Sequence, residues 1–157
     1  MYKRQIDADN VAKLTGSVAD LNTAFGAKAA SGSNGIDFGG SSGAADQAVE
    51  ITDATVLAVD LNTLNGNTSG TIDASTLSEI EGTAANANTI YDTKSGGDGF
   101  TGLGDEAITL TDTTVGAAAL IDLYTNGTSG IIDASTVHTI TGTVSYTHLT
   151  LPTNRCV

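Results

Sequence analysis

Between residues 6 and 143 the chain contains no cysteine, no proline and no tryptophan. Freedom from cysteine is compatible with secretion without disulfide formation, but cytosolic proteins can lack cysteine too, so it does not fix the compartment. A run of about 18 apolar residues, which a membrane-spanning helix needs, does not occur. We therefore expect no membrane insertion.

Basic residues are scarce as well. The whole chain has 6 Lys and Arg against 18 Asp and Glu, a net charge of −12. All 18 carboxylates lie within residues 6–143 with only three lysines, so this region alone has a net charge of −15. Such a surface repels nucleic acid and anionic lipid, and it favours solubility and divalent cations. Nucleic acid is therefore excluded as an expected partner.

The two ends differ in composition from the region between them. Residues 1–5 (MYKRQ) and 144–157 (VSYTHLTLPTNRCV) hold three of the six basic residues and the only proline, cysteine and methionine. They resemble translated adaptor sequence at the ends of short metagenomic gene fragments. We interpret both as artefactual ends and leave them out of the reasoning on fold and function.

An internal repeat dominates the remaining sequence. The stretch TSGTIDASTLSEIEGT (68–83) returns as TSGIIDASTVHTITGT (128–143) with 11 of 16 positions unchanged, and a looser copy begins at Ile6. Self-similarity of this kind is the signature of a repeat array, whose length does not define a number of domains. We interpret residues 6–143 as such an array.

Two kinds of segment alternate along the array. Four segments, which begin at Ser17, Thr55, Thr83 and Thr113, combine a capping Ser or Thr with alanine-rich sequence, and three of them reach a glycine at Gly26, Gly66 or Gly127. These features predict short helices. Between them, β-branched runs bounded by Gly, Asn, Asp and Ser predict strands. The predicted strands are 49–52, 71–74, 79–81, 108–111, 131–134 and 139–141.

The predicted helix that begins at Thr55 has an imperfect apolar stripe on one side. Asp60 and Asn62 are expected to face away from this stripe. Helices as short as these are marginal unless they pack against other elements.

The aliphatic residues Ile51, Ile80, Leu110 and Ile140 follow one another at a nearly constant spacing of about 30 residues. This spacing predicts an α/β repeat solenoid of short parallel strands alternating with short helices, with about 30 residues per turn. Because Thr and Val are poor helix formers, an all-β solenoid is the alternative. The half-units are placed near 6–47, 48–78, 79–107 and 108–137, with a partial unit at 138–143.

The apolar positions of the repeated stretch are expected to point inward. Ile72, Ala74, Leu77 and Ile80 form the predicted inward row of one turn, and Ile132, Ala134, Val137 and Ile140 repeat it. The glycine-rich segments 27–47 and 92–107 are predicted to be exposed loops. An array cut at both ends lacks capping repeats, so we expect it to be marginally stable or to self-associate.

The segments ITDATVLAVDLNTLNGNTSGTIDAST, AITLTDTTV and SGIIDAST resemble the repeats of very large bacterial secreted or cell-surface proteins. These are often called β-strand repeat proteins and are best represented among marine cyanobacteria. The resemblance covers residues 6–143. It implies a secreted or cell-surface location and a spacer, adhesive or envelope role, with neighbouring repeats and cell-surface or matrix components as partners. It implies no catalytic or ligand residues.

Calcium is the ligand that the composition favours, because hard cations take several oxygen donors. The best local candidate is GGDGFTGLGDE (96–106), which resembles one nonapeptide of a calcium-binding β-roll. Its candidate metal ligands are Asp98, Asp105 and Glu106. Thr101 stands where that motif has aspartate and no second tandem copy follows, so a solvated loop is the favoured alternative.

The repeated aspartates Asp7, Asp73 and Asp133 are predicted to form turns, because Asp before Ala-Ser-Thr readily bonds nearby amides. Asp53 and Asp112 are expected to serve helix starts in the same way.

Catalysis finds little support in the sequence. His138 is the only histidine of the array and its counterpart is Ser78, while Glu79 and Glu81 correspond to Thr139 and Thr141. A general base or a carboxylate pair has no recurring place here. We therefore expect no enzyme and no cofactor. The sequence favours a structural or adhesive repeat module, and a calcium-binding module that becomes rigid on binding Ca2+ is the alternative.

Overall fold

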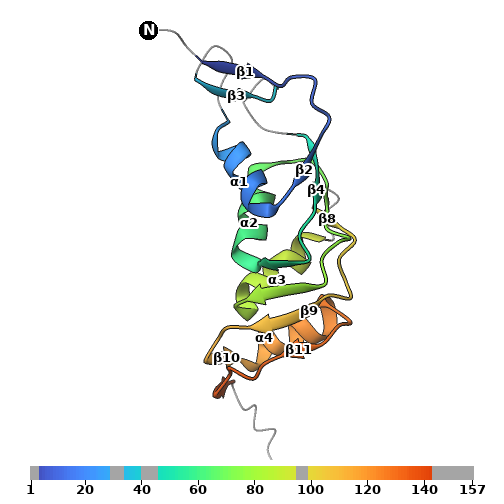
Figure 1. Ribbon diagram of the computed structural model, residues 1–157. Helices are drawn as coiled ribbons and strands as arrows, with labels where there is room; N and C mark the ends of the chain where they lie inside the picture. The colour runs from blue at the N-terminus through green and yellow to red at the C-terminus, as the bar shows by residue number, and fades with distance from the viewer. Residues whose placement is uncertain (1–3, 29–33, 40–45, 95–98, 143–157) are drawn as a thin grey trace, which may run out of the picture.

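The structure, a computed structural model, describes residues 4–28, 34–39, 46–94 and 99–142. Within these ranges four helices alternate with short parallel strands. The α/β prediction is therefore confirmed, and the all-β alternative is wrong. The molecule is elongated, with the N-terminal strands at one end and the C-terminal strands at the other (Figure 1).

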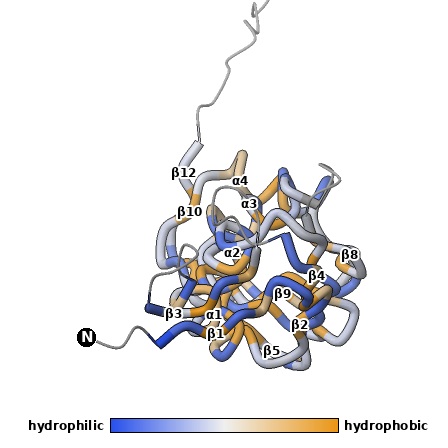
Figure 2. Tube along the Cα trace, turned by 90° about the horizontal axis from the view of Figure 1, so that it is seen from above, coloured by the Kyte–Doolittle hydropathy of each residue, from blue (hydrophilic) through white to orange (hydrophobic). Residues whose placement is uncertain are grey.

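The elements fall into five levels along the molecule, and elements of different levels partly overlap when it is viewed from above (Figure 2). The first level contains β1 (Gln5–Asp7), β2 (Lys13–Gly16) and α1 (Val18–Gly26). The second contains β3 (Gly35–Asp37), β4 (Ala48–Ile51), β5 (Thr55–Leu57) and α2 (Ala58–Asn67). The third contains β6 (Ile72–Asp73), β7 (Glu79–Gly82) and α3 (Ala84–Lys94).

The fourth and fifth levels repeat this order. The fourth contains β8 (Phe100–Thr101), β9 (Ala107–Leu110), β10 (Thr114–Gly116), α4 (Ala117–Asp122) and a π-helix, η1 (Leu123–Gly127). The fifth contains β11 (Ile132–Asp133) and β12 (Thr139–Thr141). The predicted strands are confirmed with small shifts at their ends, whereas β1, β2, β3, β5, β8 and β10 were not predicted.

Every described strand pairing is parallel and joins one level to the next. The pairings form four columns, and their strand orders are β1-β3, β2-β4-β6-β8, β5-β7-β9-β11 and β10-β12. Among the described strands no column runs through all five levels, because the pairing moves on from one column to the next along the stack. The four sheets therefore follow one another along the molecule, and each covers only part of its length.

The step between paired strands is shorter than predicted. From β4 onward every strand is paired with one that lies fewer residues ahead than the predicted turn of about 30 residues. Only the step from β2 to β4 is longer, since it contains the inserted glycine-rich segment. The evenly spaced aliphatic residues do not pair with one another: Ile80 is opposite Val56 and Ile108, and Leu110 is opposite Gly82. The spacing of about 30 residues is therefore the length of chain from one level to the next. It is not the register between paired strands of one column.

The predicted inward row is confirmed in the third level. Ile72, Ala74 and Ile80 are fully buried, and Leu77 is buried as well. In the fifth level the equivalent residues Ile132, Ala134 and Val137 are only half-buried, and Ile140 is 61% exposed. The prediction for Ile140 is wrong because β12 is the last strand of its column and no described strand covers it.

The π-helix marks a single inserted residue. Ala48 and Ala58 correspond to Ala107 and Ala117, each 59 residues later in the chain. Thr68 corresponds to Thr128, which is 60 residues later. The extra residue lies between these points, where α4 (6 residues) and η1 (5 residues) together replace α2 (10 residues). A π-turn absorbs one residue without breaking the helix, so the strands on both sides keep their places.

The predicted helix starts are right for two helices and wrong for two. Ser17 is the N-cap of α1, and Thr83 accepts a bond from the Asn86 amide at the start of α3. Thr55 begins strand β5 and Thr113 precedes strand β10, so α2 and α4 start after Leu57 and Gly116. The short strands β5 and β10 take up the residues that capping alone would have assigned to a helix.

The predicted stop glycines are only partly right. Gly26 ends α1 and Gly127 ends η1, but Gly66 lies inside α2. None of the three adopts the positive φ that makes glycine the preferred helix stop. The helices end where the chain enters the next level. Their ends do not require a glycine in the left-handed conformation.

The glycine-rich segments are not simply exposed loops. Their described parts contain β3 and β8 and the buried side chains of Phe38, Phe100 and Leu103. Phe38 packs against Phe25 of α1 with ring centroids 5.4 Å apart. Periodicity did not reveal these strands because closely spaced glycines interrupt any apolar pattern there.

Close packing between levels makes a sharp prediction at Gly70. A Cβ there would lie 2.3 Å from the Gln47 carbonyl oxygen, whereas a Cβ at Gly66 of α2 would meet nothing within 4 Å. We expect Gly70→Ala to lower the free energy of unfolding by about 1–3 kcal/mol through overpacking. The control, Gly66→Ala, should raise it by about 0.5–1 kcal/mol, because alanine is the better helix former. Urea unfolding followed by circular dichroism measures both, and equal effects would contradict the packing described here.

Candidate functional site

The repeated stretch TSGxIDAST contacts the preceding level. The threonine in its first half forms a hydrogen bond with a buried backbone carbonyl of that level. The Thr68 hydroxyl donates to the Gln47 carbonyl oxygen at 3.0 Å and accepts from the Gly70 amide at 3.0 Å. Gly70 lies directly against Gln47, which explains why this position has no side chain. A buried carbonyl left unpaired is costly, so the threonine hydroxyl is the stabilising element.

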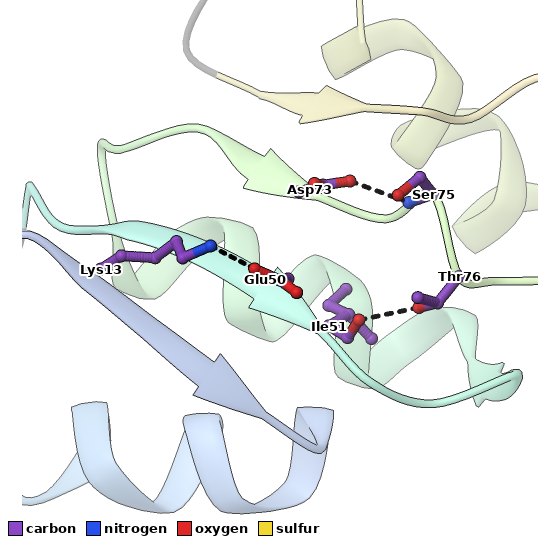
Figure 3. Close-up of polar contacts among 6 residues, drawn as sticks. All are labelled: Lys13, Glu50, Ile51, Asp73, Ser75 and Thr76. Atoms are coloured by element: carbon purple, nitrogen blue, oxygen red, sulfur yellow. Dashed lines mark hydrogen bonds and ion pairs between the residues drawn. The ribbon is translucent and has the colours of Figure 1, made fainter.

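The second half of the stretch turns the chain and bonds to the level before it. The Asp73 carboxylate accepts from the Ser75 amide at 3.1 Å, as Figure 3 shows. Thr76 points to the preceding level, and its hydroxyl donates to the Ile51 carbonyl at 2.7 Å (Figure 3). Bonds from the Ser75 hydroxyl and amide lower the pKa of Asp73. The predicted turn-forming role of Asp73 is therefore confirmed.

The second copy repeats these bonds atom for atom. Thr128 donates to the Glu106 carbonyl at 2.7 Å, and Thr136 donates to the Leu110 carbonyl at 2.6 Å. The Asp133 carboxylate accepts from the Ser135 amide at 2.8 Å, and this bond lowers its pKa. At the N-terminal end Asp7 accepts from the Asp9 amide at 3.2 Å. The threonine bonds to the preceding level and the local aspartate turn thus recur in both copies.

Two aspartates cap helices of a neighbouring level. Asp53 accepts from the Val18 amide at 2.7 Å, and Asp112 accepts from the Ala84 amide at 2.7 Å, so they cap α1 and α3. The prediction that they serve helix starts is confirmed, but the helices are not the ones that follow them in sequence. Within the described residues neither α2 nor α4 has a side-chain cap at its N-cap residue.

Asparagine side chains link the helices in order. Asn22 of α1 donates to the Asp60 carbonyl of α2 at 3.0 Å, and Asn62 of α2 donates to the Asn86 carbonyl of α3 at 3.0 Å. Asn88 of α3 then donates to the Ala119 carbonyl of α4 at 3.0 Å. The expectation that Asn62 faces away is therefore wrong, because its amide reaches the next helix along the stack.

Carboxylates and threonines cover the outer face of the sheets. Glu50 of β4 is in register with Asp73 of β6, and Lys13 of β2 forms an ion pair with Glu50 (Figure 3). In the next column Thr109 donates to Glu79 at 2.8 Å. Neighbouring strands lie about 4.8 Å apart, so carboxylates in register repel unless a cation or a hydroxyl intervenes.

The predicted metal ligands do not come together in the described residues. Asp98 lies outside them, and Asp105 is exposed. Glu106 is buried, and its carboxylate accepts from the Tyr91 hydroxyl at 3.0 Å and from the Gly104 amide at 2.9 Å. Burial, and then the adjacent Glu106 carboxylate, raise the pKa of Tyr91 well above its usual value. Because its oxygens already accept these bonds, Glu106 is a poor ligand, and calcium at Asp105 stays a prediction.

An acidic group at the N-terminal end was not predicted as a unit. Asp7 and Asp37 are register partners in β1 and β3, and partial desolvation together with the charges of these two residues raises the pKa of Asp9. Within the described residues, no three Asp, Glu, His or Cys side chains form a group that could hold a metal ion. The register of β3 brings these residues together, and the sequence did not show that register.

Open hollows lie at both ends of the stack. One of about 610 Å3 is lined by Tyr124, Thr125, Thr128, Ser129, Gly130 and Ile132 of the last two levels. Another of about 290 Å3 lies in the first level, beside β2 and α1. His138 is exposed, and among the described helices none is both long and apolar enough to cross a membrane.

No family model, curated protein or solved structure matches this chain.

Because Asp53 of the second level caps α1 of the first level, a substitution at Asp53 should destabilise α1. Asp53→Ala removes the acceptor of the Val18 amide, so we expect a loss of about 1 kcal/mol in the free energy of unfolding. Asp60→Ala, in the first turn of α2, is the matched control and should cost only a few tenths of a kcal/mol. Hydrogen exchange should show faster exchange in α1 for Asp53→Ala. Equal stability of the two variants would contradict a capping role.

Proposed function

We propose that this chain is part of a solenoid-type structural or adhesive repeat array of a large secreted or cell-surface protein. In this proposal the array acts as a spacer or as an interaction surface. The observation that supports it most is that the described strand pairings and the asparagine bonds all join neighbouring levels. A structure whose contacts are confined to nearest neighbours can lengthen by adding levels, which is the property a spacer needs.

The pattern of constant and variable residues favours the same function. Thr68 and Thr76, whose hydroxyls bond the preceding level, are unchanged as Thr128 and Thr136 in the second copy. Three positions of the same stretch differ, with Ser78, Glu79 and Glu81 against His138, Thr139 and Thr141. An array whose surface residues vary from copy to copy still needs constant bonds between its levels. The strong negative charge favours solubility of such a surface.

The repeat length gives a direct test of the solenoid proposal. A second copy of residues 48–106, inserted after residue 106, should fold as two further levels, because Ala48 and Ala107 begin equivalent strands. We expect a higher melting temperature, and a maximum dimension in small-angle scattering that is greater by about 10 Å, or two strand spacings.

A scrambled insert of the same composition is the control and should leave the melting temperature unchanged or lower it. An unfolded chain, or a melting temperature no higher than that of the original chain, would contradict the solenoid proposal.

The alternative function is a calcium-binding module that becomes rigid on binding. Two pairs of carboxylates in register, Asp7 with Asp37 and Glu50 with Asp73, favour it, because a divalent cation would relieve the repulsion within each pair. A ligand that binds the folded state alone raises the melting temperature.

Thermal unfolding in millimolar calcium and then in excess chelator tests this alternative, with magnesium at equal ionic strength as the control. The calcium module predicts a higher midpoint in calcium, a weaker response to magnesium, and loss of the gain in Asp37→Asn. An unchanged midpoint would exclude it.

A further inference from the structure

Two buried positions carry different residues in the two halves of the chain. Gln47 and Glu106 correspond, because each directly precedes the alanine that begins β4 or β9. Phe25 and Tyr91 correspond, because each lies nine residues after the glycine that ends β2 or β7. All four side chains are buried. The aromatic residue therefore carries a hydroxyl in the half that has the carboxylate, and lacks one in the half that has the amide.

Tyr91 and Glu106 form a closed pair between the third and fourth levels. The Glu106 side chain is 1% exposed, and its Oε2 accepts from the Tyr91 hydroxyl at 3.0 Å. The Gly104 amide donates to both carboxylate oxygens, at 2.9 and 3.0 Å. Burial, and then the Glu106 charge, raise the pKa of Tyr91, so its hydroxyl stays protonated as a donor. A buried carboxylate is costly unless its oxygens are bonded, and this hydroxyl offsets part of the cost.

The equivalent place between the first and second levels is neutral. The Gln47 side-chain nitrogen donates to the Phe38 carbonyl at 2.8 Å and to the Asp46 carboxylate at 3.0 Å. The Gln47 Oε1 is buried and has no hydrogen-bond partner within the part of the chain that the structure describes. Phe25 packs on the Phe38 ring and has no hydroxyl to donate. An unbonded amide oxygen costs less than an unbonded carboxylate, so this place tolerates phenylalanine.

The backbone around the two positions is held in the same way. A threonine hydroxyl donates to the Gln47 carbonyl at 3.0 Å and to the Glu106 carbonyl at 2.7 Å. A Cβ at Gly70 or at Gly130 would lie 2.3 Å from the same carbonyl oxygens. These backbone contacts do not distinguish the second level from the fourth, whereas the side chains of Gln47 and Glu106 do.

We propose that Tyr91 and Glu106 form a pairing key that specifies which level lies against α3, and that Phe25 and Gln47 form the neutral key for α1. A level that carries glutamate here is accepted by a helix with tyrosine. A helix with phenylalanine disfavours it, because the buried carboxylate then lacks a donor. Levels that share their joining bonds could otherwise stack in the wrong order, which is a characteristic failure of repeat proteins. This inference rests on the proposed array, and it adds the residues that set the order of its levels.

The test exchanges the pairs in the full chain without changing its composition. Gln47→Glu combined with Glu106→Gln gives a mismatched chain, in which the carboxylate belongs to the half with phenylalanine. We expect its unfolding equilibrium constant to rise about a hundred-fold, because a buried charge has lost its partner. Adding Phe25→Tyr and Tyr91→Phe matches both pairs again and should recover about ten-fold or more of this loss. Urea unfolding followed by circular dichroism measures both chains.

A double-variant cycle at the charged pair tests whether the two residues act together. Tyr91→Phe should raise the unfolding equilibrium constant about ten-fold or more in the unaltered chain, and about three-fold or less when Glu106→Gln is also present. Asp105→Asn is the matched control, since Asp105 is an exposed carboxylate next to Glu106. Tyr91→Phe should cost the same with and without this control substitution.

Two results would overturn the pairing key. One is a cost of Tyr91→Phe that Glu106→Gln does not reduce, and the other is a chain with all four substitutions that is no more stable than the mismatched chain. If the mismatched chain is unfolded without urea, a cooperative transition in the chain with all four substitutions is the expected recovery. Failure of these tests alongside a folded chain with residues 48–106 duplicated would reject the key and leave the proposed array intact. Recovery and coupling alongside an unfolded duplication would keep the key and reject the array.

Discussion

Every level of this molecule depends on its neighbours for its backbone hydrogen bonds. The described strands are short, such as the 2-residue β6, and the described helices, such as the 11-residue α3, are too short to be stable alone. Parallel pairing with the level above and below supplies what each strand lacks. Capping of α1 by Asp53 and of α3 by Asp112 extends the same dependence to the helices. Stability is therefore a property of the stack, and no single level has it.

Small polar side chains supplement the apolar core in joining the levels. Thr68, Thr76 and their counterparts Thr128 and Thr136 each donate a hydroxyl to a carbonyl of the preceding level. Asn22, Asn62 and Asn88 each donate a side-chain amide to a backbone carbonyl of the helix in the following level. These bonds are directional, so they fix the register of levels whose apolar rows alone would tolerate slippage. A composition rich in Thr, Asn and Ser, with few aromatic residues, is thus consistent with a well-packed stack.

The level-joining residues separate architecture from surface. Thr68 and Thr76 keep their bonds to the preceding level as Thr128 and Thr136. The residue inserted before Thr128 is absorbed by the π-helix, and β11 still pairs with β9. On the outer face of the sheets, Lys13 balances the charge of Glu50. Much of the fold was predictable from the repeat: the copies 68–83 and 128–143 placed β6, β7, β11 and β12.

Local chemistry could be read from the sequence, whereas long-range bonds could not. Asp73 and Asp133 were predictable as turn formers because their bonds reach only to the next serine. Asp53 stands before β5 and α2, yet it caps α1, which precedes it in the chain by a whole level. Glu106, in a glycine-rich segment that suggested a calcium loop, turns inward to Tyr91 of α3.

The amino-acid sequence by itself determined the alternation of strand and helix and the turn-forming role of Asp73 and Asp133. Capping, turn formation and strand preference act over a few neighbouring residues, so they leave a local pattern. Only the tertiary structure decided which level each joining residue reaches. That choice depends on the register between strands such as β4 and β6, or β7 and β9, which are far apart in the chain and whose pairing no local pattern records.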